Sequence, residues 1–182
     1  MRRPLALLLV LAASLALTAC GKENETTKVG ETEATYLTLG GLKYQVQISR
    51  QLNPFDTEDR AYVQGVDDTT PLGQDAWFGV FMRVQNPTGR ALFATSDFEI
   101  HDTQGNVYRP VPLPATNEFR YEAQEVQPDN MLPAPGSPAF NGPIRGSLLL
   151  FRLKRESFEN RPLELIIRQS GVSGEATVAL DV

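Results

Sequence analysis

Apolar and polar side chains alternate without a break from residue 42 to residue 49, in the sequence LKYQVQIS. A period of two residues is typical of a β-strand with one buried face and one solvent-exposed face. This strand should therefore bury Leu42, Tyr44, Val46 and Ile48. Because no segment of the chain shows a sustained period of 3.6 residues, the sequence predicts an all-β protein.

A second, more hydrophobic strand is predicted from Trp77 to Gln85. Alternation places one apolar set in the main core and a mixed set on the opposite face: Phe78, Val80, Met82 and Val84, and Trp77, Gly79, Phe81, Arg83 and Gln85. The aromatic residues of the mixed set, with Phe119 and Tyr121, could form an exposed ligand platform or a small secondary core. We favour the secondary core, beneath a proline-rich connection.

Shorter β-prone runs complete the inventory. Residues 98–101 and 107–109 flank the turn-rich segment 102–106, which predicts a hairpin. Residues 154–160 could form at most two turns of helix. Three further strands are expected at 147–153, 163–168 and 177–182, with weaker ones at 62–66 and 119–122.

Eight prolines lie between Pro110 and Pro143. Proline has no backbone N–H to donate within a sheet, so this density predicts a long surface connection in place of central strands. Seven to nine short antiparallel strands joined by such a connection predict a Greek-key, immunoglobulin-like β-sandwich. The chain has one cysteine, so this sandwich would form without a disulfide.

The first twenty residues have the parts of an export signal. Two arginines precede an apolar run over residues 5–17, which is too short to cross a bilayer as a helix. The sequence LTAC at residues 17–20 then resembles the bacterial lipobox. The resemblance implies cleavage between Ala19 and Cys20 and fatty-acyl chains attached at Cys20, which would anchor the protein on the extracytoplasmic face of a bacterial envelope membrane. The alternative is an ordinary secretory signal with a chance cysteine.

Removal of residues 1–19 leaves 15 Lys and Arg against 22 Asp and Glu, a formal charge of −7. An acidic surface repels phosphate, so we expect neither nucleic acid nor electrostatic adhesion to anionic lipid. Residues 21–35 carry too few large apolar side chains to repay the entropy of ordering. We therefore expect a signal peptide over 1–19, a flexible tether over 20–35 and a sandwich domain over 36–182.

Three motifs stand out in the predicted domain: RQLNP at residues 50–54, WFGVFMRVQN at 77–86, and DFEI at 97–100 leading to DTQG at 102–105. Together they resemble the telokin-like, immunoglobulin-type domain of unknown function that occurs in bacterial lipoproteins. The resemblance covers residues 36–182 and implies an extracellular module with no established activity. It supplies no catalytic residue.

The only histidine is His101, so a Ser-His-Asp triad would need it beside Ser96, Asp97 or Asp102. The chain has no G-x-S-x-G motif, and a histidine next to a turn is expected to be exposed and not catalytic. The glycines at 40–41 and 171–174 open no helix and lack the lysine of a phosphate-binding loop. We therefore expect no enzyme activity.

Soft metal ions lack a ligand set, because the mature chain offers one histidine, one lipidated cysteine, Met82 and Met131. Calcium needs only oxygen ligands, and candidate carboxylates lie in two loops: Asp56, Glu58 and Asp59, and Asp67 and Asp68. Neither loop has the spacing of a known calcium motif. We expect no metal and no cofactor.

Three functions remain. The first is a non-catalytic, membrane-anchored interaction or structural module, whose partner would be an envelope protein or ligand bound by loops such as the 110–143 connection. The second is a calcium-stabilised spacer. The third is a hydrolase on a sandwich fold, for which the single histidine gives little support.

Overall fold

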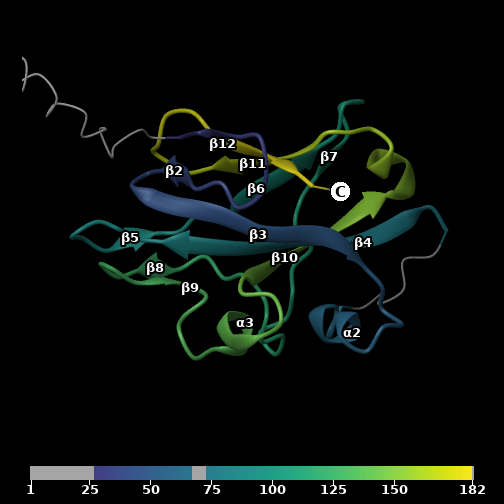
Figure 1. Ribbon diagram of the computed structural model, residues 1–182, viewed down its shortest axis with the longest axis horizontal. Coiled ribbons are helices and arrows are strands. Elements are labelled where there is room, and N and C mark those ends of the chain that lie inside the picture. The colour runs from purple at the N-terminus through teal and green to yellow at the C-terminus, as the bar shows by residue number, and fades with distance from the viewer. Residues whose placement is uncertain (1–26, 67–72, 182) are drawn as a thin grey trace, which may run out of the picture.

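Strands β3 (Leu42–Leu52) and β4 (Asp75–Gln85) form the central antiparallel pair of the computed structural model (Figure 1). The structure describes residues 27–66 and 73–181. The predicted leader, Cys20 and the pair Asp67 and Asp68 therefore lie outside the described residues.

Two sheets pack face to face in a β-sandwich, which confirms the predicted all-β class. The first sheet has the order β10, β4, β3, β2, and β9 pairs with the far end of β4. Its other strands are β2 (Leu37–Leu39), β9 (Met131–Leu132) and β10 (Ser147–Lys154). The second sheet has the order β1, β12, β11, β6, β7, with these bounds: β1 (Val29–Gly30), β6 (Asp97–His101), β7 (Val107–Tyr108), β11 (Leu163–Arg168) and β12 (Ala176–Leu180).

Connections cross between the two sheets after β1, after β4, after β7 and after β10. A separate pair, β5 (Leu92–Phe93) and β8 (Glu125–Val126), lies at one end of the sandwich (Figure 1). Short helices complete the described part of the chain: α2 (Asp59–Tyr62), α3 (Pro138–Asn141) and a 3₁₀ turn over Arg155–Phe158. That 3₁₀ turn and the hairpin β6–β7 match the sequence prediction.

The main core fills the space between the sheets. The predicted set from β4 lies in it, fully buried: Phe78, Val80, Met82 and Val84. Side chains of the second sheet meet them, among them Phe98, Ile100 and Ile167. Burial of such side chains stabilises the folded state by about 1.5–3 kcal/mol each, so this layer dominates the stability of the domain.

A secondary core lies on the opposite face of the first sheet, as predicted. Trp77 and Phe81 are buried there with Leu52 and Leu148, and partly buried Phe119 packs against them from the proline-rich connection. Gly79 lies between these side chains in the same row of β4. A Cβ atom at Gly79 would lie 3.0 Å from a methyl carbon of Leu148, so the missing side chain lets the leucines close over the strand. The alternative of an exposed aromatic platform is wrong.

Tyr121 does not belong to this secondary core. Its ring packs edge-on against Phe98 at 5.2 Å between centroids, and its hydroxyl donates to the carbonyl oxygen of Thr95 at 2.8 Å. The predicted strand at 119–122 is reduced to one bridge between Arg120 and Leu148. Within the 110–143 connection no described strand exceeds two residues, as the proline density predicts.

A β-bulge in β3 changes which face Ile48 occupies. The pairing with β4 shifts between Val46 and Ile48, so that Val46 lies opposite Met82 and Ile48 opposite Phe81. An extra residue in one strand moves all later side chains to the other face. Ile48 is therefore 38% exposed, and the prediction that it is buried is wrong.

The domain begins before residue 36. Thr38 donates its N–H to the carbonyl oxygen of Thr27, Thr177 donates to that of Lys28, and β1 pairs in parallel with β12. The carboxylate of Glu33 then accepts from the N–H and hydroxyl of Ser49 on β3 and from the N–H of Asp181 after β12, which links the two sheets. The predicted tether is therefore too long at its C-terminal end, because backbone pairing and one partly buried carboxylate order a segment that has few apolar side chains.

Candidate binding surface

Helix α2 replaces the weak strand that the sequence predicts at 62–66, and three sets of hydrogen bonds hold it. Asp56 caps its start: Oδ1 accepts the N–H of Glu58 at 2.9 Å and of Asp59 at 3.2 Å. These backbone donors, Asp59 first, lower the pKa of Asp56. A cap of this kind satisfies N–H groups that the helix itself leaves free.

Arg50 and Asn53 hold the carboxylate of Asp59, which is buried. Arg50 binds it in a two-pronged contact, with 3.1 Å between Nη1 and Oδ2, and the N–H of Asn53 donates to Oδ2 at 2.8 Å. These donors occupy the oxygens that a calcium ion at the Asp56, Glu58 and Asp59 loop would need. Over residues 27–66 and 73–181, no three carboxylate, imidazole or thiol groups gather as a metal site.

The far end of α2 is fixed by the proline-rich connection. Asn117, which is buried, donates from Nδ2 to the carbonyl oxygens of Tyr62 at 2.9 Å and Gln64 at 3.2 Å. The Tyr62 ring lies edge-on between Phe81 and Phe119, each at 4.9 Å between centroids. The helix is thus a rigid element although it has only four residues.

An open cleft of about 720 Å³ borders α2. We call its lining the α2 surface, and it consists of Pro54, Phe55, Thr57, Arg60, Ala61, Val63, Gln64 and Gly65. A second cleft of about 370 Å³ reaches Phe55 from the side of Trp77 and Arg155. Phe55 stands between the two clefts and is 79% exposed, the largest exposure among the exposed large hydrophobic residues that the structure describes.

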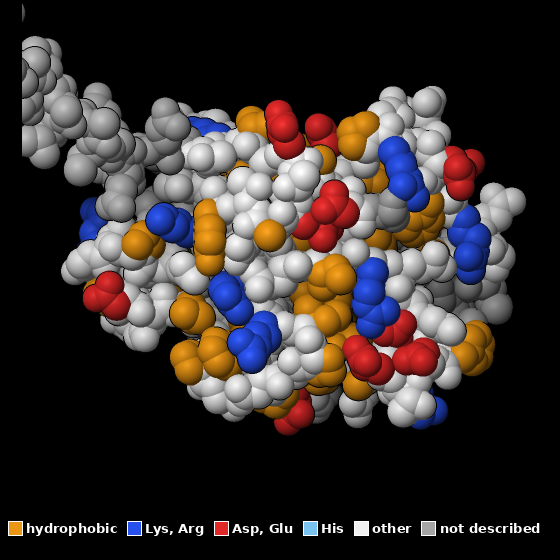
Figure 2. All heavy atoms as spheres, viewed as in Figure 1, with side chains coloured by type: hydrophobic (Ala, Val, Ile, Leu, Met, Phe, Trp, Pro, Cys, Tyr) orange, Lys and Arg blue, Asp and Glu red, His pale blue; other side chains and the backbone are white. Residues whose placement is uncertain are grey.

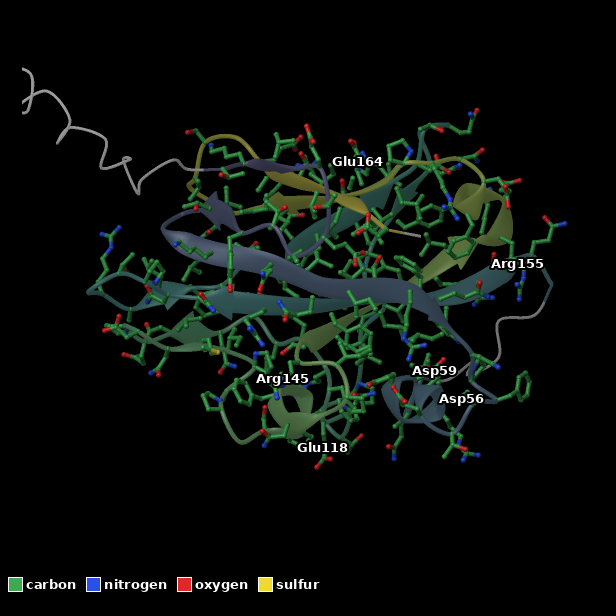
Figure 3. The ribbon with its side chains drawn as sticks, in the orientation of Figure 1. Asp56, Asp59, Glu118, Arg145, Arg155 and Glu164 are labelled. Carbon is green, nitrogen blue, oxygen red and sulfur yellow. The ribbon has the colours of Figure 1, made fainter. Side chains whose placement is uncertain are left out.

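Charged side chains of both signs lie around Phe55. Figure 2 shows acidic and hydrophobic groups side by side at the lower right of the molecule, where Figure 1 places α2. Asp56 and Asp59 lie on this part of the chain in Figure 3, and Arg155 lies nearby. Asp59 is paired with Arg50, and the exposed charged residues that the structure describes near the cleft include two of each sign: Asp56, Glu58, Arg60 and Arg155.

His101 lies elsewhere, on the outer face of the second sheet, and it pairs with Glu99. Nε2 of His101 is 3.0 Å from Oε2 of Glu99, and that carboxylate also binds Arg168 at 2.7 Å and Arg109. The hydrogen bond from His101, then that from Arg168, lowers the pKa of Glu99 to about 2. This is an ion cluster on a sheet surface, of the kind that stabilises a fold.

The structure does not bring the candidate triad together. In the described part of the chain, His101 makes no hydrogen bond to Ser96, Asp97 or Asp102. Asp102 instead accepts from the backbone and side chain of Asn106 and from the Ser157 hydroxyl at 2.7 Å. Burial raises the pKa of Asp102, but these hydrogen bonds outweigh it and set the pKa at about 2. Asp102 therefore organises the β6–β7 turn.

Sequence reasoning missed the α2 surface, since Phe55 was not among its candidates. The one available signal is a phenylalanine after Asn53-Pro54, outside any alternating pattern. No helix in the described ranges is long and apolar enough to cross a membrane. Cys20 and the Ala19–Cys20 cleavage position lie outside those ranges, so their roles stay predictions.

Comparison with protein-family models finds no match, and comparison with curated proteins finds none. Solved structures do match. The yjhA protein of Bacillus subtilis is 9% identical with a TM-score of 0.51, over 83% of this chain and 99% of that one. A functionally unknown protein of Listeria monocytogenes is 8% identical with a TM-score of 0.50, over 84% and 85% of the two chains.

A third match is a B. subtilis protein named "putative lipoprotein (ycdA)", at 12% identity and a TM-score of 0.50. The match covers 83% of this chain, which spans only 39% of that one. At such low identity these similarities show a shared fold and no more. The chain is therefore similar to a set of bacterial β-sandwich structures, and the telokin-like family stays an inference from its motifs.

Proposed function

We propose that this protein is a lipid-anchored lipoprotein of the bacterial envelope, and that its β-sandwich is a non-catalytic module that binds a protein partner at the α2 surface. The anchor follows from the LTAC sequence at residues 17–20. The similarity to a B. subtilis protein named as a putative lipoprotein supports this place in the cell. The alternative of a calcium-stabilised spacer has less support, because the carboxylate of Asp59, a candidate calcium ligand, already accepts hydrogen bonds from Arg50 and Asn53.

The observation that carries the binding role is the exposure of Phe55 on a rigid support. Phe55 is 79% exposed and lines both clefts. Covering its ring would remove apolar surface from water, which favours binding. Aromatic side chains are enriched in protein interfaces, where a few anchors supply most of the binding energy. A partner that inserts an apolar side chain into the α2 cleft would cover Phe55.

Site-specific photocrosslinking in intact cells tests this proposal. Benzoylphenylalanine at position 55 is expected to give a discrete adduct with one envelope protein, and the same residue at position 107 serves as control. Val107 is also exposed, at 45%, but lies on β7 in the other sheet. Gln64→Trp should fill the cleft from its exposed rim and reduce the adduct at position 55.

Equal adducts at positions 55 and 107 would show that contact with Phe55 is not specific. If neither position gave an adduct while the protein remained anchored and folded, a structural spacer would replace the binding module as the best interpretation.

A further inference from the structure

The described chain begins at Thr27, and this point, which we call the exit, lies at one end of the sandwich. The carbonyl oxygen of Thr27 accepts from Thr38, just before the β2–β3 turn at Gly40. Nζ of Lys28 donates to the carbonyl oxygen of Ser173 at 3.0 Å. The exit is therefore fixed to two turns, residues 40–41 and 170–174.

The same end carries an exposed aromatic residue, Phe93 on β5. Its carbonyl oxygen accepts from Nε2 of Gln169 at 3.2 Å, and the Gln169 side chain also packs against Gly40. Phe93 is 60% exposed. Figure 1 shows β5 at the end of the molecule where β2 turns into β3. We call this surface the exit end, defined by Lys28, residues 40–41, Phe93 and residues 170–174.

The connection between Cys20 and the exit is short. Seven residue steps separate Cys20 from Thr27. A fully extended chain gains at most about 3.6 Å per residue, so the two residues are no more than about 25 Å apart. A tether reaching to residue 35 would have allowed about twice that distance, and the ordering of residues 27–35 removes this freedom.

The α2 surface lies at the other end of the long strands. The eleven residues of β3 rise about 33 Å between the turn at residues 40–41 and the loop that carries Phe55. This rise exceeds the reach of the connection. A domain anchored at Cys20 therefore brings its exit end to the lipid more readily than its α2 end.

We propose that the short connection from Cys20 holds the exit end, with Phe93, against the phospholipid surface and directs the α2 surface away from it. The inference rests on the anchoring proposed above. A covalent link makes the second contact intramolecular, so even a weak apolar contact by Phe93 is populated. The proposed contact is apolar, and charges of both signs flank Phe93: Glu125 lies opposite it in the β5–β8 pair, and Lys28 is exposed at the exit.

The test supplies the anchor chemically, so that it does not depend on lipidation in cells. The thiol of Cys20, the only cysteine, is joined to a maleimide lipid in the chain 20–182 and placed in phosphatidylcholine vesicles containing a nitroxide-headgroup lipid. Azidophenylalanine at position 93 or 55 carries a click-attached fluorophore. Strong quenching at position 93 and weak quenching at position 55 are expected.

Equal quenching at the two positions, or stronger quenching at position 55, would overturn the proposed orientation. A variant with twelve Gly and Ser residues inserted after Thr26 extends the reach to about 68 Å and should reduce the preference for position 93. An undiminished preference in this variant would refute the short connection as its cause. Absence of lipid on Cys20 in cells would instead refute the proposed anchoring and leave this geometric result intact.

Discussion

The side-chain amide of Asn117 donates a 2.9 Å hydrogen bond to the backbone carbonyl oxygen of Tyr62. Asn117 belongs to the proline-rich connection, and Tyr62 ends α2, so this contact joins two segments that are 55 residues apart. The long connection thereby holds α2 in place and does not form the proposed binding surface itself.

Asn117→Ala should loosen α2. It leaves the carbonyl oxygen of Tyr62, which is buried, and that of Gln64, which is partly buried, without this donor, which costs about 1–3 kcal/mol. Urea unfolding measures the loss, and hydrogen exchange should show faster exchange in α2 than in β4. Asn141→Ala, at an exposed position of α3, is the matched control. An equally large effect of the control would remove the assigned role of Asn117.

Two buried tyrosines should respond in opposite ways to loss of the hydroxyl. The Tyr62 hydroxyl is buried without a hydrogen-bond partner in the described part of the chain, whereas that of Tyr44 accepts the N–H of Thr95 at 3.0 Å. Tyr62→Phe should raise the free energy of unfolding by about 1 kcal/mol, and Tyr44→Phe should lower it by about 1–2 kcal/mol. Thermal unfolding of both variants measures these changes. A loss of stability in Tyr62→Phe would show that the Tyr62 hydroxyl does have a hydrogen-bond partner.

Glu99 should stabilise the protein above pH 5 and lose this effect in acid. Its pKa lies at about 2, below the unfolded value, so its contribution is present above the unfolded pKa and fades as pH falls towards 2. Glu99→Gln should therefore cost about 2 kcal/mol near pH 7 and less near pH 3. Unfolding at several pH values measures the difference. Glu164→Gln, an exposed carboxylate on β11, should change stability by less than about 0.5 kcal/mol.

Glu33 should show the opposite pH dependence. Burial raises its pKa above the ordinary value despite the hydrogen bonds from Ser49 and Asp181. A raised carboxyl pKa contributes stability at low pH that is lost as pH rises through the folded value. The wild type should therefore lose stability relative to Glu33→Gln as pH rises from 4 towards 7. Glu31→Gln removes a charge from an exposed neighbour as the control, and parallel pH curves for wild type and Glu33→Gln would disprove the assignment.

Cys20→Ala should abolish membrane anchoring. Without the thiol no acyl chain can attach, and we expect an uncleaved or mislocalised precursor. Detergent-phase partitioning and the intact mass of the protein provide the measurement. A mutant protein whose intact mass still includes acyl chains would refute the lipobox assignment.

The strands could be predicted from sequence because alternation is a local property, and β3, β4, β10 and β11 lie where it indicates. The face on which Ile48 lies could not be predicted, because the bulge depends on how β3 pairs with β4. Val46 pairs with Met82 and Ile48 with the next residue, Phe81. Helix α2 was missed for a similar reason: Tyr62 at its end and Val63 just after it favour strands, and Arg50 and Asn117 from other segments hold it. The ordering of residues 27–35 depends on pairing with β12, which composition does not reveal.

The burial of β4 on both faces has a consequence for the chain before it folds. From Ala76 to Met82 every residue is buried, and no charge occurs between Asp75 and Arg83. A run of this composition favours cross-β association whenever it is exposed, and the flanking charges are its only protection. A chain delivered unfolded across a membrane would expose this run until β3 and β10 pair with it, so its yield should depend on holding chaperones in the compartment where it folds.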